Sequence, residues 1–257
     1  MKRSLYYCAM GAIAIAGTGC AYQGSSYGAH SPASYPTPYY GGCGSSYTPQ
    51  GCQNNVGGTR FDLELGAEQF VSGDIIGAGN ALGGGDTTLD VGYKDAFKSG
   101  YRVAAGLARD INPSTTVSAK GFYNEADGED GVLFGSGGQT ASFSDYKSYG
   151  AELGLRKYVG YGGAQLRPYL GGTVGAAYVD DISADDGGGP IVLNDATWVP
   201  TASGTAGFEM PLSQTGAIAL EAGLRWTGKQ DRAAGLGLGE DSSRLSVPVT
   251  LRGSFRF

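Results

Sequence analysis

The sequence predicts an all-β fold: an eight-stranded antiparallel up-and-down transmembrane β-barrel preceded by a disordered amino-terminal linker. Three observations support this prediction. Apolar and polar residues alternate with a period of two in eight segments, which is the period of a strand. The connections between these segments are alternately short and long. Large aromatic side chains collect at the segment ends on the apolar face, as they do at membrane interfaces.

Composition agrees with strands and turns. The 257 residues include 47 Gly and 17 Tyr, and only 16% are charged, a mixture that is unusual for a helical protein. The net charge of -6 argues against a nucleic-acid partner, because a phosphate backbone requires a basic surface.

Residues 1–19 have the pattern of an export signal peptide. Lys2 and Arg3 precede an uncharged apolar stretch that is too short to cross a bilayer as a helix. Small residues then lead to Cys20, as at the processing site of lipoproteins, so we expect Cys20 to be lipidated. The alternative is ordinary signal cleavage nearby, with Cys20 removed or incidental.

Residues 20–59 are rich in Gly, Ser, Pro and Tyr and are predicted to be a flexible periplasmic linker, since they contain too few aliphatic side chains to form a core. Cys43 and Cys52 lie within it, and a local disulfide is the expected state in an exported protein. A free or metal-binding cysteine pair is the alternative.

The barrel is predicted to cover residues 60–257. The alternating segments are 61–68, 101–108, 117–124, 148–156, 169–178, 198–209, 218–226 and 244–257. Pro200 and Pro248 interrupt two of them, and because Pro lacks the donor for the strand ladder we expect bulges or local irregularity there.

The connections predict the topology. Those at 112–114, 160–165 and 212–215 are short, and those at 72–98, 126–143, 180–196 and 228–243 are long and rich in Gly and Asp. Short periplasmic turns and long extracellular loops are typical of transmembrane barrels, and an even number of strands leaves both chain ends in the periplasm.

Alternation alone does not say which face is outside, because soluble lipocalin-type barrels have apolar residues inside. Here the polar face carries charges of both signs, which would pair within a lumen only wide enough for side chains. Arg109 and Lys157, on the apolar face, fall at turn ends where they can reach the interface. A solvated outer surface is the alternative for the charged face. The predicted lumen charge network is Glu64, Arg102, Lys120, Glu152, Arg156, Glu221, Arg225 and Arg252.

The strand pattern, the topology and the terminal aromatic residue together resemble small eight-stranded bacterial outer-membrane barrels of the OmpA-transmembrane, OmpX and porin-like surface-antigen type. This resemblance implies a place in the outer membrane, with outer-membrane lipid and lipopolysaccharide as neighbours. It also implies that Phe255 and Phe257 form a carboxy-terminal signal for the barrel assembly machinery.

The sequence offers little chemistry. Barrel enzymes generally use a His base, and the single His here is His30 in the predicted linker, so no catalytic residue and no cofactor are expected. Carboxylates in two loops could bind Ca²⁺, but they lack EF-hand spacing, and solvated loops or loops among bridged lipopolysaccharide phosphates are preferred over a metal site. These carboxylates are Asp127, Glu129, Asp130, Asp180, Asp181, Asp185 and Asp186.

The leading hypothesis is a non-enzymatic outer-membrane surface protein whose rigid barrel anchors long loops for envelope integrity or for contact with a host or cell-surface ligand. A narrow porin-like channel for ions or small solutes, through the charged lumen, is the alternative. A lipid-modifying barrel enzyme is the third hypothesis and needs a base other than His.

Overall fold

The computed structural model describes residues 58–78, 87–159, 166–213, 215–233 and 242–257. All of them belong to the second of two compact units, which begins at Gln53. Cys20, Cys43 and Cys52, and with them the predicted signal peptide, lipidation and disulfide, lie outside the described residues.

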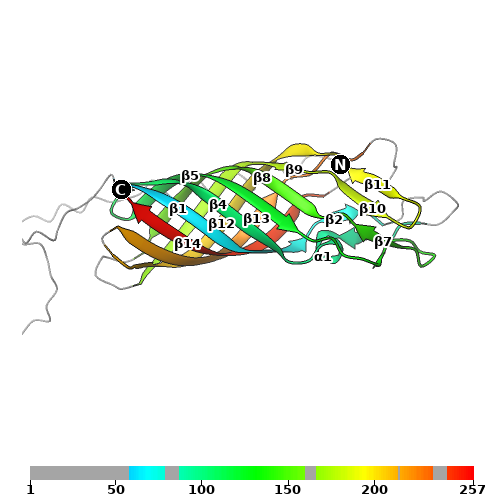
Figure 1. The fold of residues 1–257 in the computed structure, drawn as a ribbon, viewed down its shortest axis with the longest axis horizontal. Helices are drawn as coiled ribbons and strands as arrows, with labels where there is room; N and C mark the ends of the chain where they lie inside the picture. Colours follow the sequence, from blue (N-terminus) through cyan, green and yellow to red (C-terminus); the bar gives the residue numbers. More distant parts are fainter. Residues whose placement is uncertain (1–57, 79–86, 160–165, 214, 234–241) are drawn as a thin grey trace, which may run out of the picture. The chain divides into compact units, whose positions relative to one another are not determined.

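Eight long strands form a closed barrel in which every neighbouring pair is antiparallel (Figure 1). They follow one another around the barrel in chain order, and the pairing of β1 with β14 closes it. The strands are β1 (Thr59–Ser72), β4 (Gly100–Asn112), β5 (Thr115–Ala126), β8 (Tyr146–Tyr158), β9 (Arg167–Val179), β12 (Thr197–Pro211), β13 (Gly216–Thr227) and β14 (Arg244–Arg256). The predicted eight-stranded up-and-down barrel is confirmed, and each alternating segment lies in one strand, with Phe257 just past the end of β14.

The apolar face of each strand points outward. Leu63 and Leu65 of β1 are 52% and 60% exposed, whereas Asp62 and Glu64 between and beside them are 4% exposed. Successive side chains of a strand point to opposite faces, so this arrangement holds along the whole strand. It is the arrangement of a transmembrane barrel and the reverse of a soluble carrier. The described part of the chain has no helix long and apolar enough to cross a membrane.

Aromatic side chains ring the outside of the barrel near both ends. At the loop end, Tyr149, Tyr178 and Trp198 form a continuous row, with ring centroids 5.3 Å and 5.6 Å apart. At the turn end, Phe208 and Phe255 are 52% and 56% exposed. The two rings mark the two membrane interfaces.

The shifts of register between the barrel strands do not lie at the prolines. The shifts of register occur in β1 between Phe70 and Ser72, and in β4 between Asp110 and Asn112. β12 keeps its register with β9 through Pro200. Opposite Pro248 the pairing of β13 with β14 is interrupted, because Pro has no N–H to donate, but it resumes in the same register. Neither proline therefore lies at a bulge, and the interrupted pairing opposite Pro248 is the local irregularity that was expected there.

The long loops contain ordered elements that the sequence did not predict. They are β2 (Asp74–Ile76), β3 (Val91–Gly92), α1 (Tyr93–Ala96), β6 (Val132–Leu133), β7 (Thr140–Phe143), β10 (Ile182–Asp185) and β11 (Pro190–Asn194). β2 pairs with β3, and a second sheet has the order β11-β10-β7-β6. We call these elements and the described residues that connect them the loop cap.

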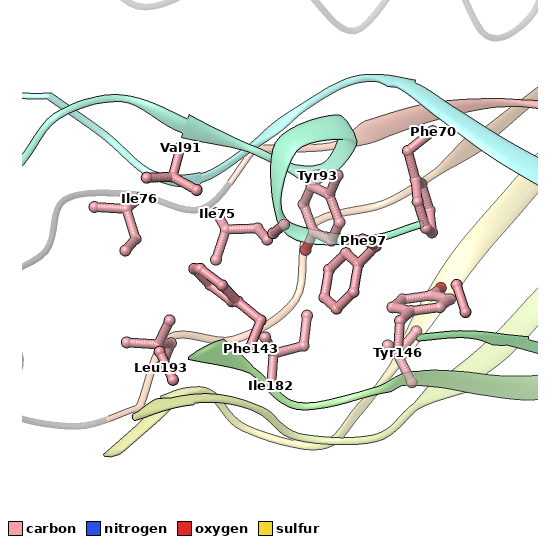
Figure 2. Packing of buried hydrophobic residues seen from close by; sticks show 14 of the residues in the cluster. Phe70, Ile75, Ile76, Val91, Tyr93, Phe97, Phe143, Tyr146, Ile182 and Leu193 are labelled. Atoms are coloured by element: carbon pink, nitrogen blue, oxygen red, sulfur yellow. The ribbon is translucent and has the colours of Figure 1, made fainter. Parts of the chain in front are cut away.

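An apolar core holds the loop cap together and sits on the loop end of the barrel (Figure 2). Phe70 at the top of β1 contacts Tyr93, Phe97 and Tyr146, with ring centroids 5.6, 5.8 and 5.0 Å away. Aliphatic side chains from β2, β3, β10 and β11 surround these rings. Burial of this much apolar surface explains why the loops fold into defined elements.

Candidate functional site: the charged lumen and the loop cap

The middle of the lumen is organised around the carboxylate of Glu152 on β8. Arg225 Nη2 lies 2.7 Å and Arg102 Nη2 3.1 Å from it, and Lys120 Nζ lies 3.8 Å away. Lys120 makes a closer pair, 2.7 Å, with Glu64. Five different strands thus meet through charged side chains, which is possible because their inward residues converge on the barrel axis.

A second group of ion pairs lies nearer the turns and is centred on Arg252 of β14. Its guanidinium is 3.0 Å from Glu221 and 3.2 Å from Glu209. The Tyr169 hydroxyl donates to Glu221 across 2.6 Å. Beside this group, Arg156 pairs with Asp62, which also accepts a hydrogen bond of 2.7 Å from Ser254.

The turn end of the lumen is closed by further pairs. Arg60 lies 3.1 Å from Asp110 and 3.5 Å from Glu209, and the Tyr158 hydroxyl donates to Glu209 across 2.6 Å. Arg256 makes a second contact of 3.0 Å with Asp110. These side chains cross the mouth of the barrel at its turn end, between β1, β4, β8, β12 and β14.

At the other end the lining changes from charged to apolar over a short distance. Arg102 and Arg225 both lie over the Phe122 ring, 4.4 and 4.3 Å from its centroid. Above them, Arg244 donates to the hydroxyls of Tyr93 and Tyr146 across 3.1 and 2.8 Å. Arg244 therefore joins the charged lining of the lumen to the core of the loop cap, to which its two tyrosine partners belong.

All members of the predicted lumen network lie on the inner face, and each takes part in at least one ion pair. The prediction omitted Arg60 and Arg244, which the alternation of β1 and β14 places on the same face as Asp62 and Ser246. It also omitted the hydroxyls of Tyr158 and Tyr169, whose acceptors lie on other strands and depend on strand tilt.

Little space is left between these side chains. Of the residues that the structure describes, six carboxylates and six guanidinium groups are buried, all of them in the barrel strands. The cavity among Glu64, Arg102, Lys120, Glu152 and Arg225 measures about 20 Å³, which is enough for a water molecule and not for a hydrated ion.

The remaining predicted positions lie on the outside or at the strand ends. Phe255 points outward, and Phe257, 79% exposed, follows the end of β14. Lys157 is outward at the turn end and donates to Ser114 Oγ across 2.9 Å. Within the described ranges no group of three or more His, Cys, Asp or Glu side chains is placed to hold a metal ion.

No protein-family model matches the chain, and no curated protein matches its sequence significantly. Solved structures match it at low identity. Neisserial surface protein A is 13% identical with a TM-score of 0.42, over 77% of this chain and 97% of that one. Outer membrane protein OprG from Pseudomonas aeruginosa is 14% identical with a TM-score of 0.43, over 78% and 97%. Ail, the attachment invasion locus protein of Yersinia pestis, is 12% identical with a TM-score of 0.41, over 78% and 99%.

Proposed function

We propose that this protein is a non-enzymatic surface protein of the bacterial outer membrane, in which a closed barrel anchors the loop cap at the cell surface. The observation that carries the proposal is the filling of the lumen. Ion pairs occupy it from Asp110 at the turn end to Arg225, and the apolar core of the loop cap covers its other end.

The alternative, a narrow channel, needs a path that these contacts obstruct. An ion passing Glu152 would have to separate it from Arg102 and Arg225, each only 3% exposed. Removing one partner of a buried pair costs about 3–5 kcal/mol, because the other charge is left without compensation. A rigid anchor uses the same network to hold the strands in one register.

The outer-membrane location is supported by the apolar outer wall and its two aromatic rings. In this orientation the chain enters β1 from the periplasm, and the exposed Phe255 and Phe257 are available to the barrel assembly machinery. Outer-membrane lipid and lipopolysaccharide surround the barrel, and the loop cap meets partners outside the cell.

A non-enzymatic role is supported by the lack of a His base, since the single His of the chain is His30. The purified protein is expected to leave labelled lipopolysaccharide and phospholipid unchanged. Release of a labelled acyl chain that depends on active protein would instead establish a lipid-modifying enzyme.

Planar-bilayer recording tests the closed lumen. We expect no discrete conductance steps from the folded protein. Steps that change in size or ion selectivity in Glu152→Ala, and not in Glu125→Gln on the outer face, would establish the channel and overturn the proposal. Glu125 is a suitable control because it also pairs with a lysine, Lys147, but outside the lumen.

A further inference from the structure

The sheet of the loop cap continues the barrel wall above the membrane. β7 leads into β8 and β10 follows β9, and the pair Ala184 and Phe143 extends the pairing of Tyr178 with Tyr149 (Figure 1). Backbone hydrogen bonds cross the seam, from Asp180 N to Lys147 O across 3.0 Å and from Ser144 N to Ser183 O across 2.9 Å.

At the aromatic row, the apolar side chains change from the outer face of this wall to its inner face. Below Tyr149, the outer face carries exposed Leu153 and Val174, and the inner face carries charges such as Glu152. Both strands are interrupted just above it, at residues 144–145 and 180–181, and the alternation shifts there by one position. Beyond the interruption, buried Phe143 and Ile182 therefore lie on the inner face, although Tyr149 and Tyr178 point outward. An apolar interior belongs to a wall that has water or polar groups outside, so the acyl chains end at the aromatic row.

We call the outer face of the cap sheet the cap wall. Strand pairing places its members on one face, because paired residues point to the same side. It has hydroxyls, small apolar side chains and a single carboxylate, Asp185, which accepts the N–H groups of Gly187 and Gly189 across 2.8 and 3.1 Å. The cap wall consists of Leu133, Thr140, Ser142, Ser183, Asp185, Pro190 and Val192.

A narrow charged band separates the cap wall from the aromatic row. Lys147 lies 3.5 Å from Glu125, which also accepts a hydrogen bond of 2.9 Å from the Tyr123 hydroxyl. Asp145, Asp180 and Asp181 lie in the same seam between the barrel and the cap sheet. These carboxylates repel a bare phosphate, so lipid phosphates at this level require divalent cations between them and the wall.

From these bands we propose that the cap wall is seated against the sugar region of lipopolysaccharide in the outer leaflet. The nine steps from Thr140 to Tyr149 rise about 3.3 Å each, which at the usual strand tilt is roughly 20 Å along the barrel axis. That height exceeds the headgroup region that holds the phosphates, which is roughly 5–8 Å thick on each side of a bilayer. Sugars present hydroxyls and C–H groups, which match the hydroxyl and aliphatic side chains of the cap wall. The inference rests on the outer-membrane placement proposed above.

Hydroxyl-radical footprinting with residue-level mass spectrometry tests the proposal on the full chain. The adjacent residues Val192 and Ile191 are 40% and 47% exposed, but Val192 pairs with Ser183 on the cap wall and Ile191 with buried Ala184. In vesicles with a lipopolysaccharide outer leaflet and Mg²⁺, we expect Val192 oxidation to fall at least threefold relative to Ile191. In phospholipid vesicles, the ratio of Val192 oxidation to Ile191 oxidation is expected not to fall.

A ratio that is the same in both membranes would overturn the proposal, as would equal protection in lipopolysaccharide truncated to lipid A, because phosphates alone would then suffice. Low oxidation of Leu153 and Leu220 in both membranes shows that the barrel is inserted, so failure at the cap wall is distinguishable from failure of the outer-membrane placement. As a second measure, Val192→Asp is expected to lose the lipopolysaccharide-dependent rise in Tm that the wild type and Ile191→Asp retain.

Discussion

Glu152 is the residue on which most of the buried charge of the barrel depends. Arg102, Lys120 and Arg225 all approach it within 4 Å, and each reaches it from a different strand. Charges in such a site are stable only while their partners remain, because the lumen offers almost no water to replace them.

Glu152→Ala is therefore expected to lower the free energy of unfolding by about 3–5 kcal/mol, since it leaves guanidinium groups without a counter-charge. Urea unfolding in lipid vesicles, followed by tryptophan fluorescence, measures the loss. Glu125→Gln on the outer face is the matched control and should change stability much less, because its pair with Lys147 is accessible to solvent. Equal losses in the two variants would show that the lumen pairs have no special role.

Gly207 is another lumen position that tolerates little change, because no space is left there for a side chain. A Cβ at this position would lie 2.6 Å from Cζ and Oη of Tyr169, whose hydroxyl bonds to Glu221. We expect Gly207→Ala to displace the ring and to cost about 1–3 kcal/mol, the usual range for overpacking. Gly204→Ala, in the same strand, is the control because a Cβ there meets nothing within 4 Å. Urea midpoints that are alike for the two variants would contradict the close packing.

Among the elements, the loop cap and the barrel strands draw on different forces. The strands are joined by continuous antiparallel ladders and inward ion pairs. The loop cap has short strands and depends on its aromatic core, in which Phe97 contacts Phe70, Tyr93, Phe143 and Tyr146. The two parts should therefore respond separately to core substitutions.

Phe97→Ala is expected to destabilise the loop cap by about 3–5 kcal/mol, the usual cost of removing a buried Phe, and to leave the barrel closed. Limited proteolysis of the inserted protein should then cut the loops at least tenfold faster, while the barrel keeps its heat-modifiable migration in detergent gels. Leu133→Ala, at a cap residue that is 51% exposed, should be cut at the wild-type rate. Loss of the compact barrel form in Phe97→Ala would show that the two parts fold as one.

The strands could be predicted from the sequence and the loop cap could not, for a physical reason. In a barrel strand, every second residue is apolar and points outward, so about ten residues carry one repeated signal. The core residues of the loop cap, such as Ile75, Ile76 and Val91, occur in short runs among glycines. Their partners are distant in the chain; Tyr93 meets Arg244 at a separation of 151 positions.

The lumen was accessible to sequence reasoning only in part. Alternation shows which charges point inward, and so it identified Glu64 and Lys120 as lumen residues. It does not show that they meet each other, 56 positions apart, because the partner of each charge depends on how far neighbouring strands are staggered around the barrel. The tyrosine hydroxyls were missed for the same reason, whereas the inward direction of Arg244 follows from the alternation of β14 and could have been predicted.

At the scale of the whole barrel, one arrangement accounts for the strands, the lumen and the aromatic rows: apolar side chains meet lipid and charges are enclosed. Both tryptophans of the chain, Trp198 and Trp226, lie on the outer face near the loop end, 61% and 38% exposed. Their fluorescence therefore reports on what surrounds the barrel, and no substitution is needed to introduce a probe.

Fluorescence quenching of these two tryptophans by brominated lipids in vesicles is the most direct test of this arrangement. We expect strong quenching by lipids brominated close to the headgroup, weaker quenching by lipids brominated near the chain ends, and little quenching by aqueous iodide. Strong quenching by iodide together with no effect of any brominated lipid would place the apolar wall out of contact with lipid and contradict the account.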